Sequence, residues 1–210
     1  MNRKKIDRFW KERTKIKDPR VATHFKHDDT HVYDLRLIKK LIKPDTEVLD
    51  LACGTCYISN QFVDQVRYIK AVDKFPQFLK RCKKTPKMET VTCDILTFTD
   101  RKKYDLILLI GIMLFFDYQD SEIIYRKCHA LLNKGGIMLA RHQCGVKKDV
   151  VVDKYSQTVG GNYYAQYKHF DKELQMLEKI FKKVTVVDVL PKHLNPWPDT
   201  HHYAFICKKT

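Results

Sequence analysis

Three aspartates stand where the sequence predicts buried strands to end, and their side chains could hold parts of one ligand. Asp73 follows Asp50 by 23 residues, and Asp94 comes behind the next predicted strand. Ligands of open parallel sheets bind beyond the carboxyl ends of the strands, so we expect these carboxylates at one edge. A carboxylate at Asp73 can accept both ribose hydroxyl hydrogens of a nucleoside. Asp94 can receive an adenine amino group, and Ile95 beside it could pack against the ring.

The segment between Asp50 and Tyr57 predicts a loop that a ligand can approach closely. Ala52, Cys53 and Gly54 carry small side chains, and N–H groups at the start of a following helix can meet negative charge. The G-x-G-x-x-G spacing that holds a dinucleotide pyrophosphate is absent from the loop. The loop therefore favours a nucleoside ligand over a dinucleotide.

Strands and helices alternate along the chain, which predicts the sheet that positions these residues. The predicted strands are 48–51, 68–72, 90–93, 106–110 and 137–140, and the clearest helices are 6–16, 30–42, 121–132 and 171–181. Apolar strands that alternate with helices are typical of a parallel sheet covered on both faces. The last apolar segments, 184–189 and 202–207, are joined by too short a connection for a helical crossover, so we expect an antiparallel hairpin.

Five motifs occur in a fixed order in the core of the chain. Val48–Cys56 is a hydrophobic strand followed by a small-residue loop, and Ala71–Asp73, Cys93–Ile95, Tyr104–Ile107 and Leu131–Gly136 come after it. In order, these segments resemble the motifs of class I methyltransferases, whose first motif is typically a strand followed by D-L-G-C-G-T-G. The resemblance implies methyl transfer from S-adenosyl-L-methionine, with S-adenosyl-L-homocysteine as the product.

The resemblance also implies a fold and a set of binding residues. The fold is α/β: a seven-stranded, mostly parallel, Rossmann-like sheet with an antiparallel last strand, helices on both faces and an N-terminal helical cap. The implied cofactor-binding residues are Arg20, Asp50, Ala52, Cys53, Gly54, Tyr57, Asp73, Lys74, Asp94, Ile95, Ile110 and Gly111. Ala52 and Cys56 stand where the family commonly has glycine, and Cys56 does not easily adopt a positive φ. The detailed conformation of the loop is therefore left open.

The length of the chain fits a single methyltransferase domain over residues 1–210. Its expected parts are an N-terminal helical cap at 1–43, a cofactor-binding core at 44–141, a lid or acceptor-binding insertion at 142–170, and a C-terminal helix and hairpin at 171–210.

The methyl acceptor needs contacts of its own, and a hydroxyl acceptor is helped by a base. His142 follows the fifth predicted strand and is the candidate base, with a histidine that only hydrogen-bonds a loop as the alternative. Tyr155 and Tyr163 lie in the predicted lid, His24 in the cap, and His201 before the last strand. These four are the candidate substrate-binding residues, with packing tyrosines and surface histidines as the alternative.

The composition bounds the partners of the protein. The 40 Lys and Arg against 25 Asp and Glu give a net charge of +15, which attracts anions, although ordinary solvated lysines are an equal alternative. No apolar run is long enough to span a membrane and no signal peptide is present, so we expect a cytoplasmic protein. The seven cysteines are expected as reduced thiols. The Cys53–Cys56 pair has no second CxxC, so no metal site is expected.

The leading functional hypothesis is O-methylation of a small anionic acceptor, either phosphorylated or linked to a nucleotide or sugar. Trp10, Asp18–Arg20 and Asp28–Thr30 resemble bacterial enzymes of surface-polysaccharide or nucleotide-sugar pathways. The alternative is an RNA methyltransferase, which the charge favours. Against it, Gly111–Leu114 lacks the Asn/Asp-Pro-Pro-Tyr/Phe element of many amino-directed nucleic-acid enzymes. A non-enzymatic binder is a third hypothesis, and the oligomeric state stays open.

Overall fold

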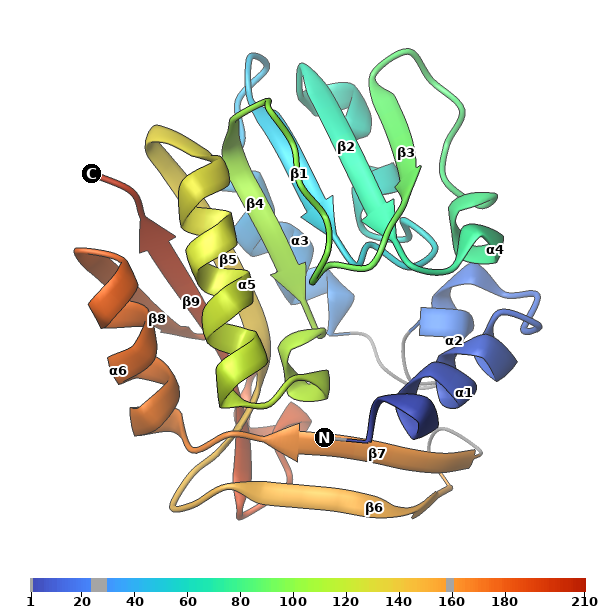
Figure 1. The fold of residues 1–210 in the computed structure, drawn as a ribbon, viewed down its shortest axis with the longest axis vertical. Helices are drawn as coiled ribbons and strands as arrows, with labels where there is room; N and C mark the ends of the chain where they lie inside the picture. Colours follow the sequence, from blue (N-terminus) through green and yellow to red (C-terminus); the bar gives the residue numbers. More distant parts are fainter. Residues whose placement is uncertain (1, 24–29, 158–160) are drawn as a thin grey trace.

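The computed structural model describes residues 2–23, 30–157 and 161–210, and a seven-stranded sheet runs through it (Figure 1). The strands are β1 Glu47–Leu51, β2 Tyr68–Asp73, β3 Met88–Thr92, β4 Tyr104–Ile110, β5 Leu132–Gly145, β8 Lys183–Asp188 and β9 Thr200–Lys208. Their order across the sheet is β3-β2-β1-β4-β5-β9-β8. The chain therefore builds outward from β1 in both directions.

Strand direction follows the prediction from the sequence. The first five strands pair in parallel, and β9 runs antiparallel to both β5 and β8. The central strand β4 is apolar because both of its faces are covered, and Leu106 to Leu109 are at most 1% exposed. The predicted mostly parallel sheet with an antiparallel last strand is confirmed.

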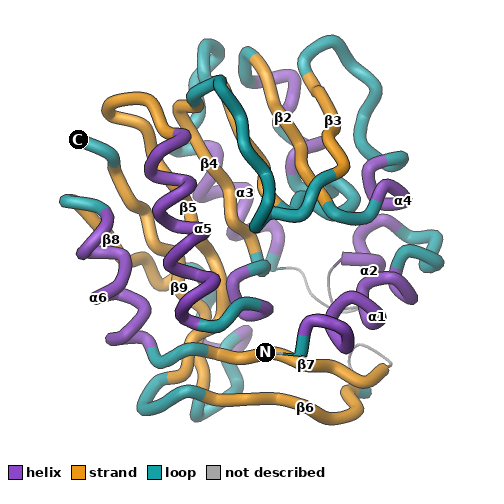
Figure 2. The backbone as a smooth tube through the Cα atoms, in the orientation of Figure 1, coloured by secondary structure: helices purple, strands orange, loops and turns teal. Residues whose placement is uncertain are grey.

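Helices cover both faces of this sheet (Figures 1 and 2). The helices are α1 Arg3–Arg13, α2 Pro19–Thr23, α3 His31–Lys39, α4 Pro76–Leu79, α5 Tyr118–Leu131 and α6 Phe170–Ile180, and the 3-10 turns are Ser59–Gln61, Val63–Gln65, Met113–Phe115 (η3) and Lys192–Leu194. Ile124 and Tyr125 of α5 belong to the core of one face, and Leu35 and Ile38 of α3 to the core of the other. The connection from β1 to β2 contains only 3-10 turns, and the connection from β2 to β3 contains the short helix α4.

A separate two-stranded sheet lies across the carboxyl ends of the central strands, next to α1 (Figure 1). Its strands, β6 Val150–Ser156 and β7 Gly161–Tyr167, pair antiparallel. The sequence predicted a lid in this region but no strands. Phe9 of α1 and Tyr163 of β7 meet edge to face, with ring centroids 5.5 Å apart. The hairpin and α1 together wall off one edge of the large sheet.

Candidate functional site

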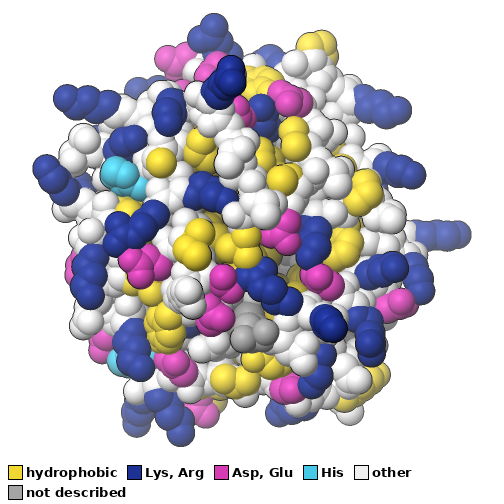
Figure 3. All heavy atoms as spheres, viewed as in Figure 1, with side chains coloured by type: hydrophobic (Ala, Val, Ile, Leu, Met, Phe, Trp, Pro, Cys, Tyr) yellow, Lys and Arg dark blue, Asp and Glu magenta, His cyan; other side chains and the backbone are white. Residues whose placement is uncertain are grey.

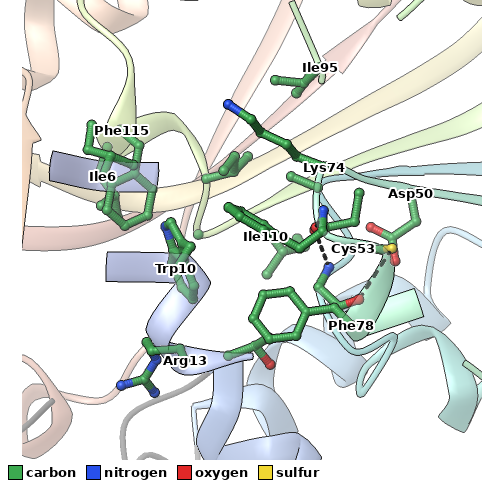
Figure 4. A pocket seen from close by; sticks show the side chains of 18 of the residues that line it. Ile6, Trp10, Arg13, Asp50, Cys53, Lys74, Phe78, Ile95, Ile110 and Phe115 are labelled. Atoms are coloured by element: carbon green, nitrogen blue, oxygen red, sulfur yellow. Dashed lines mark hydrogen bonds between the residues drawn. The ribbon is translucent and has the colours of Figure 1, made fainter. Parts of the chain in front are cut away.

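A cavity of about 210 Å³ lies at the carboxyl ends of β1, β2 and β4, against α1 (Figure 4). Asp50 and Cys53 lie on one side of it, and Ile6, Trp10 and Phe115 on the other. The predicted cofactor-binding residues that line it are Asp50, Ala52, Cys53, Gly54, Tyr57, Asp73, Lys74, Asp94, Ile95, Ile110 and Gly111. Of the residues predicted to bind the cofactor, Arg20 alone is missing from this lining.

The loop after β1 keeps a left-handed backbone at three alternate positions. Ala52 has φ 58°, Gly54 has φ 56° and Cys56 has φ 56°. A side chain on Gly54 would not fit, because an added Cβ would lie 2.6 Å from Cγ2 of Thr23 on α2. The left-handed conformation costs about 1–2 kcal/mol for a residue with a Cβ. Ala52 and Cys56 therefore hold the conformation that glycine would adopt without strain.

The side chain of Asp73, at the end of β2, accepts hydrogen bonds from two backbone N–H groups. Its Oδ2 accepts a hydrogen bond from the Gly54 N–H at 2.8 Å, and its Oδ1 accepts one from the Phe75 N–H at 2.8 Å. Burial raises the pKa of Asp73 to about 6, against the lowering effect of these two hydrogen bonds. Each carboxylate oxygen has a second lone pair, so the group can still accept ribose hydroxyls.

Asp50 in β1 is slightly more buried than Asp73 and also lines the cavity. The Ser59 hydroxyl donates to its Oδ2. Burial raises the pKa of Asp50 to about 6, and the nearby Asp73 adds to this rise. Two close carboxyl groups with raised pKa values give the floor a strongly negative character above pH 6.

Asp94 takes part in a bridge that joins the sheet to α1. Lys74 Nζ lies 3.2 Å from Asp94 Oδ2 and 2.8 Å from Asp7 Oδ2 on α1. The other oxygen of Asp94 accepts a hydrogen bond from the Leu96 N–H at 3.0 Å. Lys74 therefore fixes α1 over the part of the cavity where an adenine ring is predicted.

Gly111 leaves an opening where β4 ends. Its φ is 69°, and an added Cβ would have no heavy atom within 4 Å. Its N–H donates to the Arg141 carbonyl at 2.7 Å, which holds the ends of β4 and β5 together. A residue with a side chain would be strained at this positive φ, so the backbone conformation at Gly111 favours glycine and keeps this space open.

The opposite wall of the cavity is aromatic. Trp10 meets Phe9 at 5.1 Å and Phe115 at 5.4 Å between ring centroids, and Phe115 meets Tyr163 at 6.1 Å, all edge to face. Arg13 lies over the rings of Phe9 and Trp10 and donates to backbone carbonyls of α2. This wall joins α1, η3 and β7, three segments far apart in the chain.

Polar side chains of β5 and β9 line the cavity beyond Gly111. Arg141 Nε lies 2.8 Å from Asp34 Oδ1 of α3, and Gln143 donates to the Thr200 hydroxyl at 2.6 Å. Burial, with the neighbouring Arg141 charge, lowers the pKa of His202 to about 2, so its imidazole is neutral at neutral pH. Its Nδ1 is buried without a hydrogen-bond partner among the described residues.

Two of the predicted histidines, His142 and His201, lie on the other face of the sheet. Gln143 stands opposite His202 in the β5–β9 register, and the next pair along the strands contains His201. Neighbouring residues of a strand point to opposite faces. His142 is fully buried, with Nε2 3.2 Å from Glu173 Oε1, and His201 Nε2 lies 2.9 Å from Asp188 Oδ1. Neither histidine lines the cavity.

The remaining predicted site residues divide between the cavity and the surface. Tyr163 lines the cavity, whereas Tyr155 is 63% exposed and does not. Arg20 lies on α2 outside the lining. His24 lies outside the described residues. Sequence reasoning missed Arg141, Gln143 and His202, and the signal that could have found them is the two-residue alternation of β5 and β9.

Two of the seven cysteines correct the expectation of reduced thiols. Cys56 and Cys82 are joined by a disulfide with Cα atoms 5.1 Å apart. The expectation weighed number and spacing along the sequence, whereas α4 folds back so that residues 26 positions apart meet. Among the described residues the other five cysteines are thiols.

The sheet order, the single antiparallel strand within it and the cavity at the strand ends define the Rossmann-like fold of class I methyltransferases. Residues 48–136 match the model of a family described as a methyltransferase domain. This part of the chain is therefore a methyltransferase domain, and the class predicted from the motifs is confirmed. No curated protein sequence matches the chain.

Solved structures share this fold at low sequence identity. Phosphoethanolamine N-methyltransferase 1 of Haemonchus contortus, with phosphoethanolamine and S-adenosylhomocysteine, has a TM-score of 0.75 and 13% identity over 99% of this chain and 49% of that chain. The N-methyltransferase NodS of Bradyrhizobium japonicum, with S-adenosylhomocysteine, has a TM-score of 0.68 and 14% identity over 95% and 97%. A Burkholderia thailandensis 1,6-didemethyltoxoflavin-N1-methyltransferase has 0.65 and 18% over 88% and 80%.

Proposed function

We propose that this chain uses S-adenosylmethionine to methylate an oxygen atom of a small anionic acceptor, either phosphorylated or linked to a sugar or nucleotide. The observation that carries the proposal is one cavity with two different ends. Asp73 and Asp94 lie at one end, Arg141 and His202 at the other, and all four line the same space. Methyl transfer needs the donor and acceptor atoms about 3–3.5 Å apart, which a shared cavity provides.

The carboxylate end supports S-adenosylmethionine as the methyl donor. Asp73 is placed to accept hydrogen bonds from the ribose, and Asp94 and Ile95 lie beside it where the adenine would bind. Gly111 leaves space for the methionine part. The three similar structures named above all contain S-adenosylhomocysteine, the product of such a reaction.

The aromatic wall of the cavity supports a small acceptor. Trp10, Phe115 and Tyr163 pack edge to face along this side of the cavity, which favours a small acceptor. Two of the similar structures are named for small acceptors, phosphoethanolamine and 1,6-didemethyltoxoflavin. The face of the molecule in Figure 3 mixes Lys and Arg with Asp and Glu.

The arginines of the cavity support an anionic acceptor, and His202 supports an oxygen atom. The arginines Arg3, Arg13 and Arg141 line the cavity, and guanidinium groups suit phosphate and carboxylate. A neutral imidazole at His202 can accept the hydrogen bond of an acceptor hydroxyl and so orient its oxygen atom toward the methyl donor. The similar structures named above are N-methyltransferases, so amines belong in the same test.

The test is a screen of labelled methyl transfer from S-adenosylmethionine into phosphorylated metabolites, sugar nucleotides and matched amines. Transfer into an anionic hydroxyl compound supports the proposal. Transfer only into amines overturns the oxygen assignment, and transfer only into bulk RNA, with binding that weakens steeply with salt, establishes the RNA alternative.

Two adjacent histidines give a matched pair of variants. His202→Gln should lower kcat at least tenfold, because His202 lines the cavity. His201→Gln should change it less than twofold, because His201 pairs with Asp188 on the other face. Equal effects of the two substitutions would contradict the assigned acceptor end.

Within the described residues no helix is long and apolar enough to cross a membrane. We extend the proposal to a cytoplasmic protein that acts in the assembly of surface polysaccharides or their nucleotide-sugar precursors. Fractionation of the cells that make the protein, with detection of the chain in each fraction, tests the location. Recovery with membranes after a high-salt wash would oppose it.

A further inference from the structure

Three cysteine sulfurs lie together at the cofactor loop, and the proposed methyl transfer assigns no chemical step to them. Cys53 and Cys56 belong to the loop after β1, and Cys82 lies just past α4. The three Sγ atoms are all within 4.8 Å of one another. Cys56 and Cys82 form the disulfide, and Cys53 Sγ lies 3.7 Å from Cys56 Sγ. This cluster gives a role to the side chain that replaces the usual glycine.

Cys56 occupies a position where a side chain is unfavourable. Its φ of 56° is in the left-handed region, at a cost of about 1–2 kcal/mol for a residue with a Cβ. In exchange the side chain brings a sulfur into the contact with Cys82 that glycine could not make. Both Cys56 and Cys82 are buried, while Cys53 is half-buried and lines the cavity.

The spacing of the sulfurs matches one tetrahedral metal centre. Thiolates bound to one Zn²⁺ at about 2.3 Å are about 3.8 Å from each other. The Cys53–Cys56 sulfur distance is 3.7 Å, and the Sγ of Cys82 is within 4.8 Å of both. The remaining distance, between the sulfurs of Cys56 and Cys82, can reach this spacing once the disulfide opens. A phosphine reductant opens it, because phosphorus is oxidised to the phosphine oxide with oxygen from water and both sulfurs become thiols.

Carboxylates lie close to the cluster. Asp50 and Asp73 line the same cavity as Cys53. Their negative charge favours a positive ion bound at the sulfurs.

We propose that, after the Cys56–Cys82 disulfide is reduced, Cys53, Cys56 and Cys82 bind one soft d¹⁰ metal ion, such as Zn²⁺ or Cd²⁺, as thiolates. Binding releases the three thiol protons to solvent and leaves a fourth coordination position for water. Soft sulfur ligands select such ions over Mg²⁺ or Ca²⁺. The disulfide and the metal site exclude each other, because the same sulfurs serve both.

The experiment titrates Cd²⁺ into the full chain, once after phosphine reduction and once without it. Ultraviolet absorption of cadmium–thiolate bonds reports the ligands, and equilibrium dialysis with elemental analysis reports the number of ions bound. We expect one Cd²⁺ per chain in the reduced protein and at least a hundredfold weaker binding without reduction. Equal binding in both states, or none after reduction, would overturn the proposal.

Variants assign the binding to this cluster. Cys53→Ser leaves the disulfide pair intact and should weaken Cd²⁺ binding to the reduced chain at least tenfold, as should Cys82→Ser. Cys93→Ser, which changes a half-buried thiol outside the cluster, should leave the titration unchanged. Loss of binding in Cys93→Ser alone would place the site elsewhere. Circular dichroism of each variant establishes that it is folded.

A separate titration keeps this inference apart from the proposed function. Binding of S-adenosylhomocysteine to the untreated chain is measured by calorimetry. A chain that binds S-adenosylhomocysteine but no Cd²⁺ after reduction refutes the metal site and leaves the methyltransferase proposal standing. A chain that binds Cd²⁺ but no S-adenosylhomocysteine does the reverse.

Discussion

The two ends of the cavity are built in different ways. At the cofactor end, the carboxylates lie at or close to strand ends, and Asp73 accepts hydrogen bonds from the Gly54 and Phe75 N–H groups nearby. At the acceptor end, Phe115 and Tyr163 meet only because η3 and β7 fold together. Local sequence therefore specifies the first end, and tertiary packing creates the second. Substitutions at the two ends should accordingly separate cofactor binding from acceptor binding.

The largest expected effect is at the cofactor end. Asp73→Ala removes the acceptor for two ribose hydroxyls, each worth about 1.5 kcal/mol as a hydrogen bond to a charged group. The expected loss of S-adenosylhomocysteine affinity is about a hundredfold, measured by calorimetry. Asp64→Ala, which removes an exposed carboxylate paired with Lys83, is the control and should change nothing. Unchanged affinity in Asp73→Ala would show that the ribose binds elsewhere.

The pH dependence of cofactor binding sharpens the same point. The pKa of Asp73 is raised to about 6 by burial, so the group is protonated in the empty site below that pH. Ribose hydroxyls need the carboxylate, so S-adenosylhomocysteine affinity should fall by up to about tenfold per pH unit below pH 6. Calorimetry between about pH 5 and pH 8, on both sides of this pKa, measures how the affinity depends on pH. Asp73→Asn should flatten it, and an equally steep slope in that variant would assign the titration to another group.

The raised pKa values of Asp50 and Asp73 also make the free energy of unfolding depend on pH, in the opposite direction to cofactor affinity. Because Asp50 and Asp73 have folded pKa values of about 6, above the usual value, the folded state binds their protons more tightly than the unfolded state. Their contribution to stability is complete below about pH 4 and is lost as the pH rises through 6. Cofactor binding and the stability of the empty protein therefore respond to these carboxyls in opposite directions.

At the acceptor end the expected effect is smaller and falls on a different constant. Tyr163→Leu removes a ring from the aromatic wall and should raise KM for the acceptor about fivefold, since one aromatic contact contributes about 0.5–1.5 kcal/mol. The affinity for S-adenosylhomocysteine should change less than twofold. Tyr155→Leu is the control, because Tyr155 is exposed on β6. A loss of cofactor affinity as large as the change in KM would erase the distinction between the ends.

The contrast between the ends also explains how far the sequence could predict the molecule. Apolar strands and their terminal carboxylates are local patterns, so the sheet and the residues around Asp73 followed from them. The acceptor end depends on which side chains of β5 and β9 point to the cavity side of the sheet. A shift of one residue carries a side chain through the sheet, so His202 lines the cavity and His201 does not. The alternation along β9 places His201 and His202 on opposite faces, and only the pairing with β5 shows which of them faces the cavity.

Two further features came from contacts that the sequence could not show. The β6–β7 hairpin was expected only as a lid, because its first strand carries polar and apolar residues without a clear alternation. The disulfide joins Cys56 to a residue whose proximity depends on the fold of α4. In both cases the determining neighbour is distant in the chain.

The smallest expected effect concerns the replaced glycines of the cofactor loop. Ala52→Gly removes a left-handed residue with a Cβ, worth about 1–2 kcal/mol, and loosens the unfolded chain by about 0.4–1 kcal/mol. The free energy of unfolding should therefore rise by about 0.5–1 kcal/mol, measured with urea. Ala130→Gly, in the exposed last turn of α5, should lower it by up to about 1 kcal/mol, since glycine has a lower helix propensity than alanine. Because the same substitution is expected to act with opposite sign at the two sites, a decrease at both would show that the loop does not hold Ala52 in a left-handed conformation.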